Sequence, residues 1–200
     1  KNYSVPKFNQ LMVAPFNLRS RLTTLINREI RNAKAGKKAE IFLKLNNLVD
    51  EDVIEKLYAA SKAGVKIRMI VRGICSLVPG LPGISENIEA ISIVDKFLEH
   101  NRVFVFHNLG KPDLFIGSAD LMTRNLDHRI EVVLPILDDK IKKQLLQMME
   151  LQWKDNVKAR VFNETQSNVF KLKAAGEKTV RSQDAIYDFW QDFGSGKKKK

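Results

Sequence analysis

The 200-residue chain is 44% hydrophobic and 28% charged, which suits one globular domain and excludes wholesale disorder. Lysine and arginine outnumber aspartate and glutamate by 34 to 23, and the formal net charge is +11, of which Lys197 to Lys200 contribute four. An excess of this size fits a polyanionic partner, such as nucleic acid, a nucleotide or a phosphate polymer, or an anionic membrane surface. It fits a basic surface without any such partner equally well.

The sequence predicts neither a disulfide nor a thiolate metal cluster, because Cys75 is its single cysteine. No apolar run approaches the roughly 18 to 20 residues that span a bilayer, and no signal peptide opens the chain. We therefore expect a cytoplasmic protein, with peripheral association to the inner membrane as an alternative. The chain begins at Lys1 without Met, which suggests a piece of a longer protein.

The first expected elements are a strand and a helix. Residues 11–14 form a short apolar run that Pro15 stops, which predicts a strand. Asn17 is then expected to cap a helix over residues 18–34, in which leucine and isoleucine recur at helical spacing. Arg19 falls in the first turn, where the helix dipole disfavours a cation unless an anion lies nearby. The position of Arg19 is therefore a weak indication that phosphate binds at the start of this helix.

A β-α-β unit comes next. Residues 39–45 predict a strand, an amphipathic helix follows that Asp50 caps and Gly64 ends, and residues 65–71 predict a second strand. A unit of this length predicts a right-handed parallel crossover.

The remaining elements are shorter. Further strands are expected at residues 89–94, 103–106, 114–116, 129–136, 159–162 and 169–172, with a helical turn at 95–99 and helices at 141–153 and 183–190. Because strands and helices alternate, we expect an α/β fold with a mixed sheet flanked by helices.

His100 is the main candidate for chemistry, because it precedes a strand and lies two residues before Arg102. Imidazole can accept, donate or carry a phosphoryl group near neutral pH, and arginine binds phosphate oxygens bidentately. The sequence has three histidines and no pair at the H-x-x-x-H spacing of a helical zinc site, so a zinc enzyme is not expected. Taken alone, His100 fits an ordinary surface histidine better than a catalytic one.

A second motif, Gly117-Ser118-Ala119-Asp120, follows the strand at 114–116. Such a turn presents backbone N–H groups and a hydroxyl to an anion, and by itself it equally fits a plain strand-to-helix turn. With the upstream H-x-R, the sequence resembles the phospholipase D superfamily, whose half-sites read H-x-K and then G-S-x-N. Arg102 stands in place of the lysine, and the superfamily's intervening aspartate has no clear counterpart. Nuclease or lipase activity is therefore not expected.

A closer resemblance is to the long, multidomain bacterial polyphosphate kinases. It is carried by sequence strings at residues 12–19, 44–50, 64–67, 71–77, 82–88, 92–95, 97–100, 117–120 and 124–127. The most specific are V-R-G-I-C-S-L at 71–77 and P-G-I-S-E-N-I at 82–88.

The resemblance implies an α/β phospholipase D-like domain that works with a preceding domain of the same kind. The family transfers the terminal phosphoryl group of ATP reversibly to polyphosphate, through a phosphohistidine and with Mg²⁺. The phosphohistidine belongs to the preceding domain, so this chain alone is expected to be inactive, and none of its residues is expected to ligate the metal.

The resemblance also implies roles for single residues. His100 matches the second-domain histidine, which assists proton transfer or stabilises charge, and Glu131 matches the carboxylate that pairs with it. Arg72 matches a phosphate-binding arginine, and Gly73 permits close approach of the backbone. Apart from the family pattern, Arg102, Lys44, Arg19 and Arg124 are secondary candidates for binding ATP or polyphosphate, and an ordinary surface charge explains each of them equally well.

The same interpretation divides the chain into an inter-domain linker (1–10), the phospholipase D-like C-terminal catalytic domain (11–165), a C-terminal arm and helix (166–193) and a Gly/Ser/Lys tail (194–200). The expected partners are ATP, ADP, polyphosphate, the preceding domain and further copies of the full-length protein. Two alternatives stay open: a module that only binds polyanions, and a degenerate phospholipase D-type phosphodiesterase.

Overall fold

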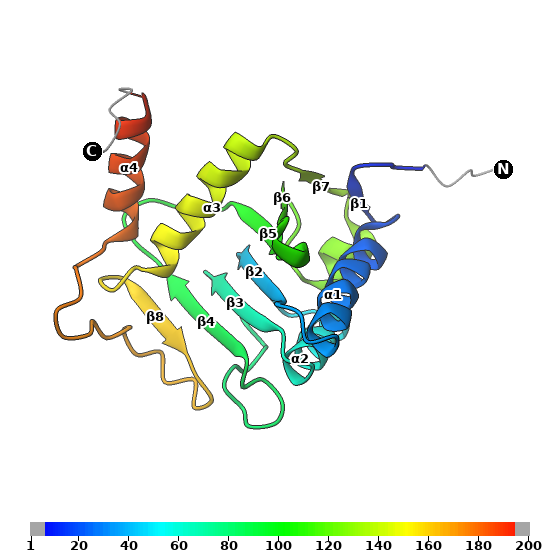
Figure 1. Ribbon diagram of the computed structural model, residues 1–200, viewed down its shortest axis with the longest axis horizontal. Helices are drawn as coiled ribbons and strands as arrows, with labels where there is room; N and C mark the ends of the chain where they lie inside the picture. The colour runs from blue at the N-terminus through cyan, green and yellow to red at the C-terminus, as the bar shows by residue number, and fades with distance from the viewer. Residues whose placement is uncertain (1–6, 195–200) are drawn as a thin grey trace.

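The computed structural model describes residues 7–194 and has three layers, with one sheet between helices (Figure 1). The eight strands are ordered β1-β7-β6-β5-β2-β3-β4-β8. Their bounds are β1 Met12–Ala14, β2 Glu40–Leu45, β3 Lys66–Val71, β4 Ile88–Ile93, β5 Arg102–Phe106, β6 Asp113–Gly117, β7 Glu131–Pro135 and β8 Ala159–Phe162. Strands β2, β3 and β4 pair in parallel and every other pairing is antiparallel, so the expected mixed sheet is confirmed.

Within the described residues, four α-helices accompany the sheet: α1 Leu18–Lys34, α2 Glu51–Lys62, α3 Asp139–Trp153 and α4 Ser182–Gly194. A 3-10 turn (Asn108–Gly110) joins β5 to β6, and a π-helical turn (Arg124–His128) precedes β7. Helices α1 and α2 cover one face of the sheet and α3 crosses the other, while α4 stands beside α3 (Figure 1).

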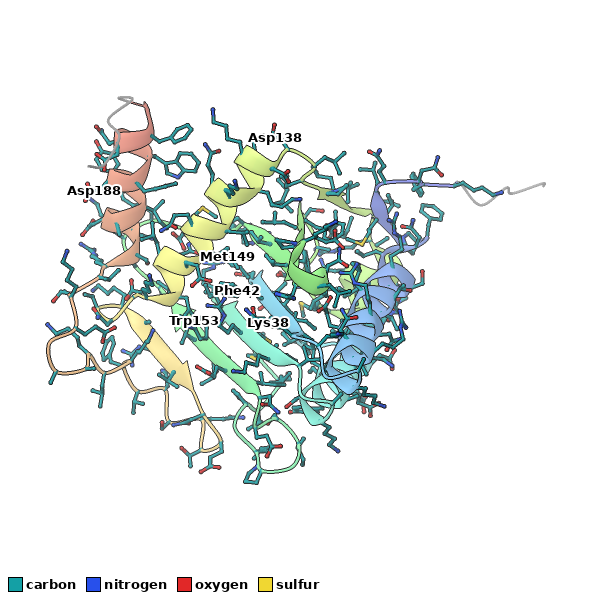
Figure 2. All side chains as sticks on the ribbon, viewed as in Figure 1. Lys38, Phe42, Asp138, Met149, Trp153 and Asp188 are labelled. Carbon is teal, nitrogen blue, oxygen red and sulfur yellow. The ribbon has the colours of Figure 1, made fainter. Side chains whose placement is uncertain are left out.

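Both faces of the central strands are buried, which explains their nearly continuous apolar sequences. Alternate residues of one strand enter different cores, as Leu43 packs toward α1 and α2 whereas Phe42 packs toward α3. On the α3 side, Phe42 meets Trp153 edge to face and Met149 is fully buried (Figure 2). The sheet is therefore fixed from both sides, and side chains at its ends are held on a rigid support.

The sequence-based elements are confirmed with three exceptions. Asn17 precedes α1, but its side chain makes no cap, because Oδ1 accepts from the backbone N–H of Val13 at 2.6 Å. Residues 95–99 form no helical turn. The strand expected at 169–172 is reduced to a single bridge between Phe170 and Arg160.

Two further expectations concern the ends of the chain and the membrane. Residues 1–6 of the expected linker and residues 195–200 of the expected tail lie outside the described residues. Across residues 7–194, no helix combines the length and the apolar character that a membrane crossing needs.

Candidate functional site

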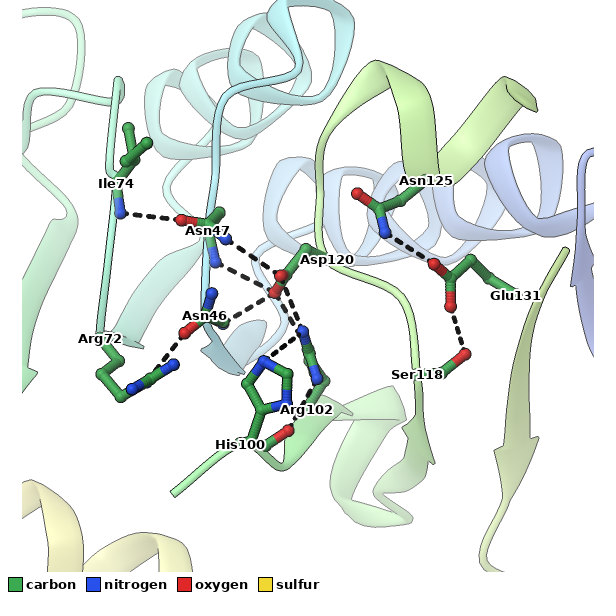
Figure 3. A network of polar contacts seen from close by, with 10 residues as sticks. All are labelled: Asn46, Asn47, Arg72, Ile74, His100, Arg102, Ser118, Asp120, Asn125 and Glu131. Atoms are coloured by element: carbon green, nitrogen blue, oxygen red, sulfur yellow. Dashed lines mark hydrogen bonds and ion pairs between the residues drawn. The ribbon is translucent and has the colours of Figure 1, made fainter. Parts of the chain in front are cut away.

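The candidate residues meet at one edge of the sheet because of its topology. Parallel strands β2 and β3 end together, which brings Asn46 beside Arg72. Strand β5 runs antiparallel to β2 and begins at this edge with Arg102, which pairs with Gly117 at the end of β6. His100, just before β5, and Ser118, just after β6, therefore lie at the same edge as Arg72 (Figure 3).

Asp120 is the centre of the polar network at this edge. Its Oδ1 accepts from the backbone N–H groups of Asn46 (2.8 Å) and Asn47 (3.0 Å), and its Oδ2 accepts from Asn47 Nδ2 (3.1 Å). Arg102 donates to both oxygens, from Nε at 3.1 Å and from Nη2 at 2.8 Å. Burial alone would raise the pKa of Asp120, but the hydrogen bonds from Arg102, Asn47 and Asn46 outweigh it and lower that pKa.

Arg102 holds His100 rather than presenting itself to a ligand. Its Nη1 donates to the His100 carbonyl at 2.8 Å, and its Nη2 lies 3.0 Å from His100 Nε2. A guanidinium can only donate, so Nε2 of His100 accepts, and a neutral His100 carries its proton on Nδ1. Arg102 is buried with its charge directed at Asp120. This does not favour the predicted role of Arg102 as a phosphate ligand; the structure makes it a support for the exposed His100.

Glu131 does not pair with His100, contrary to the expectation from the family pattern. One carboxylate oxygen accepts a short hydrogen bond from Ser118 Oγ, and the other accepts from Asn125 Nδ2 at 2.7 Å. Asn125 belongs to the π-helical turn, which places its amide against the start of β7. Glu131 thus fixes the Gly117-Ser118 turn, where a Cβ on Gly117 would lie 2.5 Å from the Val132 carbonyl oxygen.

Arg72 lies at the end of β3 with part of its guanidinium open. Its Nε donates to Asn46 Oδ1 at 2.8 Å, and nothing within residues 7–194 accepts from Nη1 or Nη2. The backbone behind it is tightly packed, since Gly73 N–H donates to the Asn46 carbonyl at 2.8 Å. A Cβ at Gly73 would lie 2.8 Å from Asn47 Oδ1 and 2.9 Å from the Asn46 carbonyl oxygen, which confirms the expected close approach. The geometry offers an oriented arginine with two free donors.

Lys44 is buried and paired on the α3 side of the sheet. Its Nζ donates to Glu99 Oε2 at 2.7 Å, and only 3% of its side chain is exposed. Burial lowers the pKa of Lys44, the nearby Glu99 opposes that shift, and the charge of Arg72 adds to it. Its predicted role in binding phosphate is therefore not favoured, because a ligand would have to replace Glu99.

Arg19 is occupied in the same way, by aspartates. Its guanidinium donates to both oxygens of Asp50 (2.7 and 2.8 Å), to both oxygens of Asp127 (2.8 and 2.6 Å) and to Asp52 (3.1 Å). The bonds to Asp50 and Asp127 raise the pKa of Arg19. The anion that the first turn of α1 was expected to need is thus supplied by the protein. Arg124, by contrast, is exposed at the start of the π-helical turn.

Asn46, Asn47 and Glu99 belong to the site although the sequence did not predict a role for them. An asparagine pair directly after a buried strand is a signal that could have found the first two, because such residues often orient groups at strand ends. No local sequence pattern predicts the role of Glu99, because its partner Lys44 lies 55 residues earlier in the chain.

The residues present do not fit a resident metal ion. Over the described part of the chain, no group of three or more His, Cys, Asp or Glu side chains is arranged to hold one. The carboxylates of Asp120 and Glu131 at this edge are also engaged, Asp120 by Arg102 and asparagine donors, and Glu131 by Ser118 and Asn125. Mg²⁺ is commonly held by few carboxylates together with substrate phosphates.

Comparison with known proteins agrees with this geometry. The family model described as polyphosphate kinase C-terminal domain 2 matches residues 11–183. A polyphosphate kinase of Vibrio vulnificus is 58% identical over 183 residues, which cover 92% of this chain and 26% of that protein. The chain therefore spans about a quarter of the length of this relative.

Solved structures give the same result. The crystal structure of polyphosphate kinase from Porphyromonas gingivalis superposes with a TM-score of 0.92 at 44% identity, over 96% of this chain and 29% of that one. Nuc, a phospholipase D family member from Salmonella typhimurium, superposes with a TM-score of 0.56 at 16% identity, over 77% of this chain and 97% of that one. The second likeness confirms the phospholipase D-like fold, and the family match over most of the sequence shows that this chain belongs to the polyphosphate kinase family, as a C-terminal domain of such a kinase.

Proposed function

We propose that this chain is the C-terminal catalytic part of an enzyme that reversibly transfers the terminal phosphoryl group of ATP to polyphosphate. The observation that carries the proposal is Arg72, whose Nη1 and Nη2 have no protein partner in the described chain while Asn46 fixes its direction. It lies at the edge that also holds His100 (Figure 3). Membership of the polyphosphate kinase family supports ATP and polyphosphate as the anions that Arg72 binds.

In this proposal Arg72 binds the oxygens of the phosphoryl group in transit, because phosphoryl transfer depends mainly on positioning and on compensating negative charge. Arg102 Nη2 lies 3.0 Å from Nε2 of His100, so a neutral His100 carries its proton on Nδ1. From Nδ1–H it can donate a hydrogen bond to an oxygen of the leaving or attacking phosphate.

The nucleophile belongs to the part of the protein that this chain does not include. We propose that a histidine of a preceding phospholipase D-like domain attacks the terminal phosphorus of ATP. The bond from that phosphorus to the bridging oxygen breaks, ADP leaves with the electron pair, and the phosphohistidine then passes its phosphoryl group to polyphosphate. Mg²⁺ would enter with the nucleotide's phosphates and screen their charge. Homo-oligomerisation of the full-length enzyme and a cytoplasmic or inner-membrane-associated location remain predictions of the same proposal.

The test uses the full-length kinase that carries this domain. His100→Ala is expected to lower kcat for polyphosphate synthesis by about 100-fold or more, the usual contribution of a positioned acid-base group. His128→Ala, at another exposed histidine, is the matched control and should leave turnover within about two-fold. Near-normal turnover of the folded His100→Ala enzyme would refute the role of His100.

A second experiment addresses the division of labour between the two domains. The purified 200-residue chain, given ATP and Mg²⁺, is expected to make no polyphosphate. ATP-dependent chain growth by this piece alone would contradict the assignment of the phosphohistidine to the preceding domain. Salt-dependent binding of many polyanions, together with normal activity of Arg72 and His100 variants, would favour a plain polyanion-binding module instead.

A further inference from the structure

The loop over residues 94–101 carries His100 from β4 to β5, and it forms neither helix nor strand. Several of its side chains are exposed, including Val94 at 66%, Phe97 at 63% and Leu98 at 74%. A loop with so little apolar burial is expected to be mobile unless other contacts hold it. Three of its residues, Asp95, Phe97 and Glu99, are held by parts of the chain that are distant in sequence.

Asp95 is bound by Arg181, which directly precedes α4. Arg181 Nε donates to Asp95 Oδ2 at 2.8 Å and Nη2 donates to Oδ1 at 2.7 Å, so the pair is bidentate. Only 2% of the Asp95 side chain is exposed. The hydrogen bonds from Arg181 lower the pKa of Asp95, so the pair stays ionised at neutral pH.

Phe97 is bound through its backbone by Gln183 in the first turn of α4. The N–H of Phe97 donates to Gln183 Oε1 at 3.0 Å, and Gln183 Nε2 donates back to the Phe97 carbonyl at 2.9 Å. A side-chain amide that satisfies both backbone groups of one residue fixes the loop much as a neighbouring strand would.

Glu99, directly before His100, is held on the α3 side of the sheet. Its Oε2 accepts from Lys44 Nζ at 2.7 Å and from Gln152 Nε2 at 2.8 Å. Lys44 and Gln152 are 2% and 1% exposed, so the carboxylate is held by two buried donors. Arg102 follows His100 by two residues and donates to its carbonyl, whereas Glu99 precedes it and is bound by Lys44. The chain is therefore fixed both before and after His100.

The start of α4 is itself anchored to the core. Asp155, buried directly after α3, accepts from the backbone N–H of Ser182 at 2.7 Å. Its other oxygen accepts from the N–H groups of Val157, Lys158 and Ala159. Arg181 and Gln183 therefore reach the loop from a fixed base, even though the segment between β8 and α4 has little regular structure.

We infer that Glu99 and Arg181 are positioning residues for His100, and that the C-terminal arm contributes to catalysis by holding the loop over residues 94–101. The inference rests on the proposed role of His100. It assigns an active-site function to a segment outside the sheet and helices α1 to α3. The arm does not touch the reacting groups; it restricts where His100 can lie.

The test measures kcat and KM of the full-length kinase with Glu99→Gln or Arg181→Gln. Each is expected to lower kcat by about 10-fold to 100-fold, because small displacements of a catalytic group cost this much, while KM for ATP stays within about two-fold. Glu55→Gln and Arg31→Gln, exposed on α2 and α1, are the matched controls and should behave like the unmodified enzyme. An unchanged kcat, or a higher KM with unchanged kcat, would overturn the inference.

Two further measurements separate this inference from the proposed function. If Arg181 acts through His100, Arg181→Gln should add no further loss to His100→Ala, whereas independent roles would give multiplied losses. Hydrogen exchange of the amides in residues 94–101 should be faster in both variants than in the two controls. Normal turnover of His100→Ala defeats the proposed function. Loss in His100→Ala with normal Arg181→Gln and Glu99→Gln defeats only the positioning role.

Discussion

Two arginines, Arg19 and Arg72, lie near the ends of regular elements, yet their surroundings give them different roles. Arg19 donates to the carboxylates of Asp50, Asp52 and Asp127. Within residues 7–194, Arg72 donates only from Nε, to the neutral amide oxygen of Asn46. A carboxylate orients an arginine and neutralises it, whereas an asparagine orients it and leaves its charge available. The difference shows that partner chemistry, more than position at an element's end, decides which cation can bind phosphate.

Asp120, a carboxylate at the same edge of the sheet as Arg72, is engaged by other donors. Asp120 could pair with an arginine at this edge, but Arg102 and the asparagine donors already occupy its oxygens. At Arg19 the opposite holds, because Asp50 caps α2 and still has room for the guanidinium. One arginine therefore joins α1, α2 and the π-helical turn, and the other remains free for a ligand.

The largest effect is expected for Arg72→Gln in the full-length kinase. Removing a phosphate-binding guanidinium should lower kcat/KM by about 100-fold or more, which corresponds to roughly 3 kcal/mol of transition-state stabilisation. Unfolding free energy should change by no more than about 1 kcal/mol, since one hydrogen bond to Asn46 is lost. Arg129→Gln, at another exposed arginine, is the control. Full activity of Arg72→Gln would mean that Arg72 does not bind the phosphate.

Arg19→Gln is expected to give the reverse pattern. Asp50, with 3% of its side chain exposed, would lose its main partner, and the free energy of unfolding should fall by about 2–3 kcal/mol. Urea denaturation of the purified chain measures this, with Arg31→Gln as a control that should stay within about 0.5 kcal/mol. Activity per folded full-length molecule should be retained. A stable Arg19→Gln protein with impaired ATP turnover would assign Arg19 to the phosphate site after all.

A smaller effect is expected where the backbone supports Arg72. The Cβ of Gly73→Ala would lie 2.8 Å from Asn47 Oδ1 and 2.9 Å from the Asn46 carbonyl oxygen, so the strand ends must shift. Overpacking of this kind costs about 1–2 kcal/mol of unfolding free energy. Because Asn46 also orients Arg72, turnover of the full-length enzyme should fall more than that of Arg19→Gln. If Gly73→Ala matched the unmodified enzyme in stability and activity, the space between Gly73 and the two asparagines would be large enough for a methyl group.

The sequence predicts much of the fold because helices and strands are local patterns. The helix over residues 18–34 agrees with α1 because its apolar spacing is nearly ideal, and the β-α-β unit agrees because two buried strands flank one amphipathic helix. The turn expected over residues 95–99 failed for a physical reason. Asp95, Phe97 and Glu99 bond outward to Arg181, Gln183 and Lys44, and within the segment the Lys96 N–H donates to the Asp95 side chain rather than along a helical ladder.

The site is predicted less completely, because partner choice depends on residues far apart in the chain. His100 is a candidate from its place before a strand, and the roles predicted for His100 and Arg72 come from the family resemblance. The pairing of Arg19 with Asp127 spans 108 residues, and no local pattern indicates it. Glu131 shows the same limit, since the π-helical turn that brings Asn125 to its carboxylate has no clear signature in the sequence.

The smallest expected effect is a change in the pH dependence of stability. Burial alone would raise the pKa of Asp50, but hydrogen bonds from Arg19, Thr123 and the Val53 N–H outweigh it and hold that pKa below its usual value. At acidic pH, Asp50 is therefore protonated more often in the unfolded chain than in the folded one. This stabilisation is complete above the pKa of Asp50 in the unfolded chain and is lost as the pH falls through its pKa in the folded protein.

Arg19→Gln removes the strongest hydrogen bond to Asp50, so the stability of this variant should decline less between about pH 5 and pH 2. Arg72→Gln, which has no carboxylate partner, should keep the slope of the unmodified chain in urea midpoints measured across that range. Equal slopes in all three proteins would mean that Arg19 does not control the ionisation of Asp50.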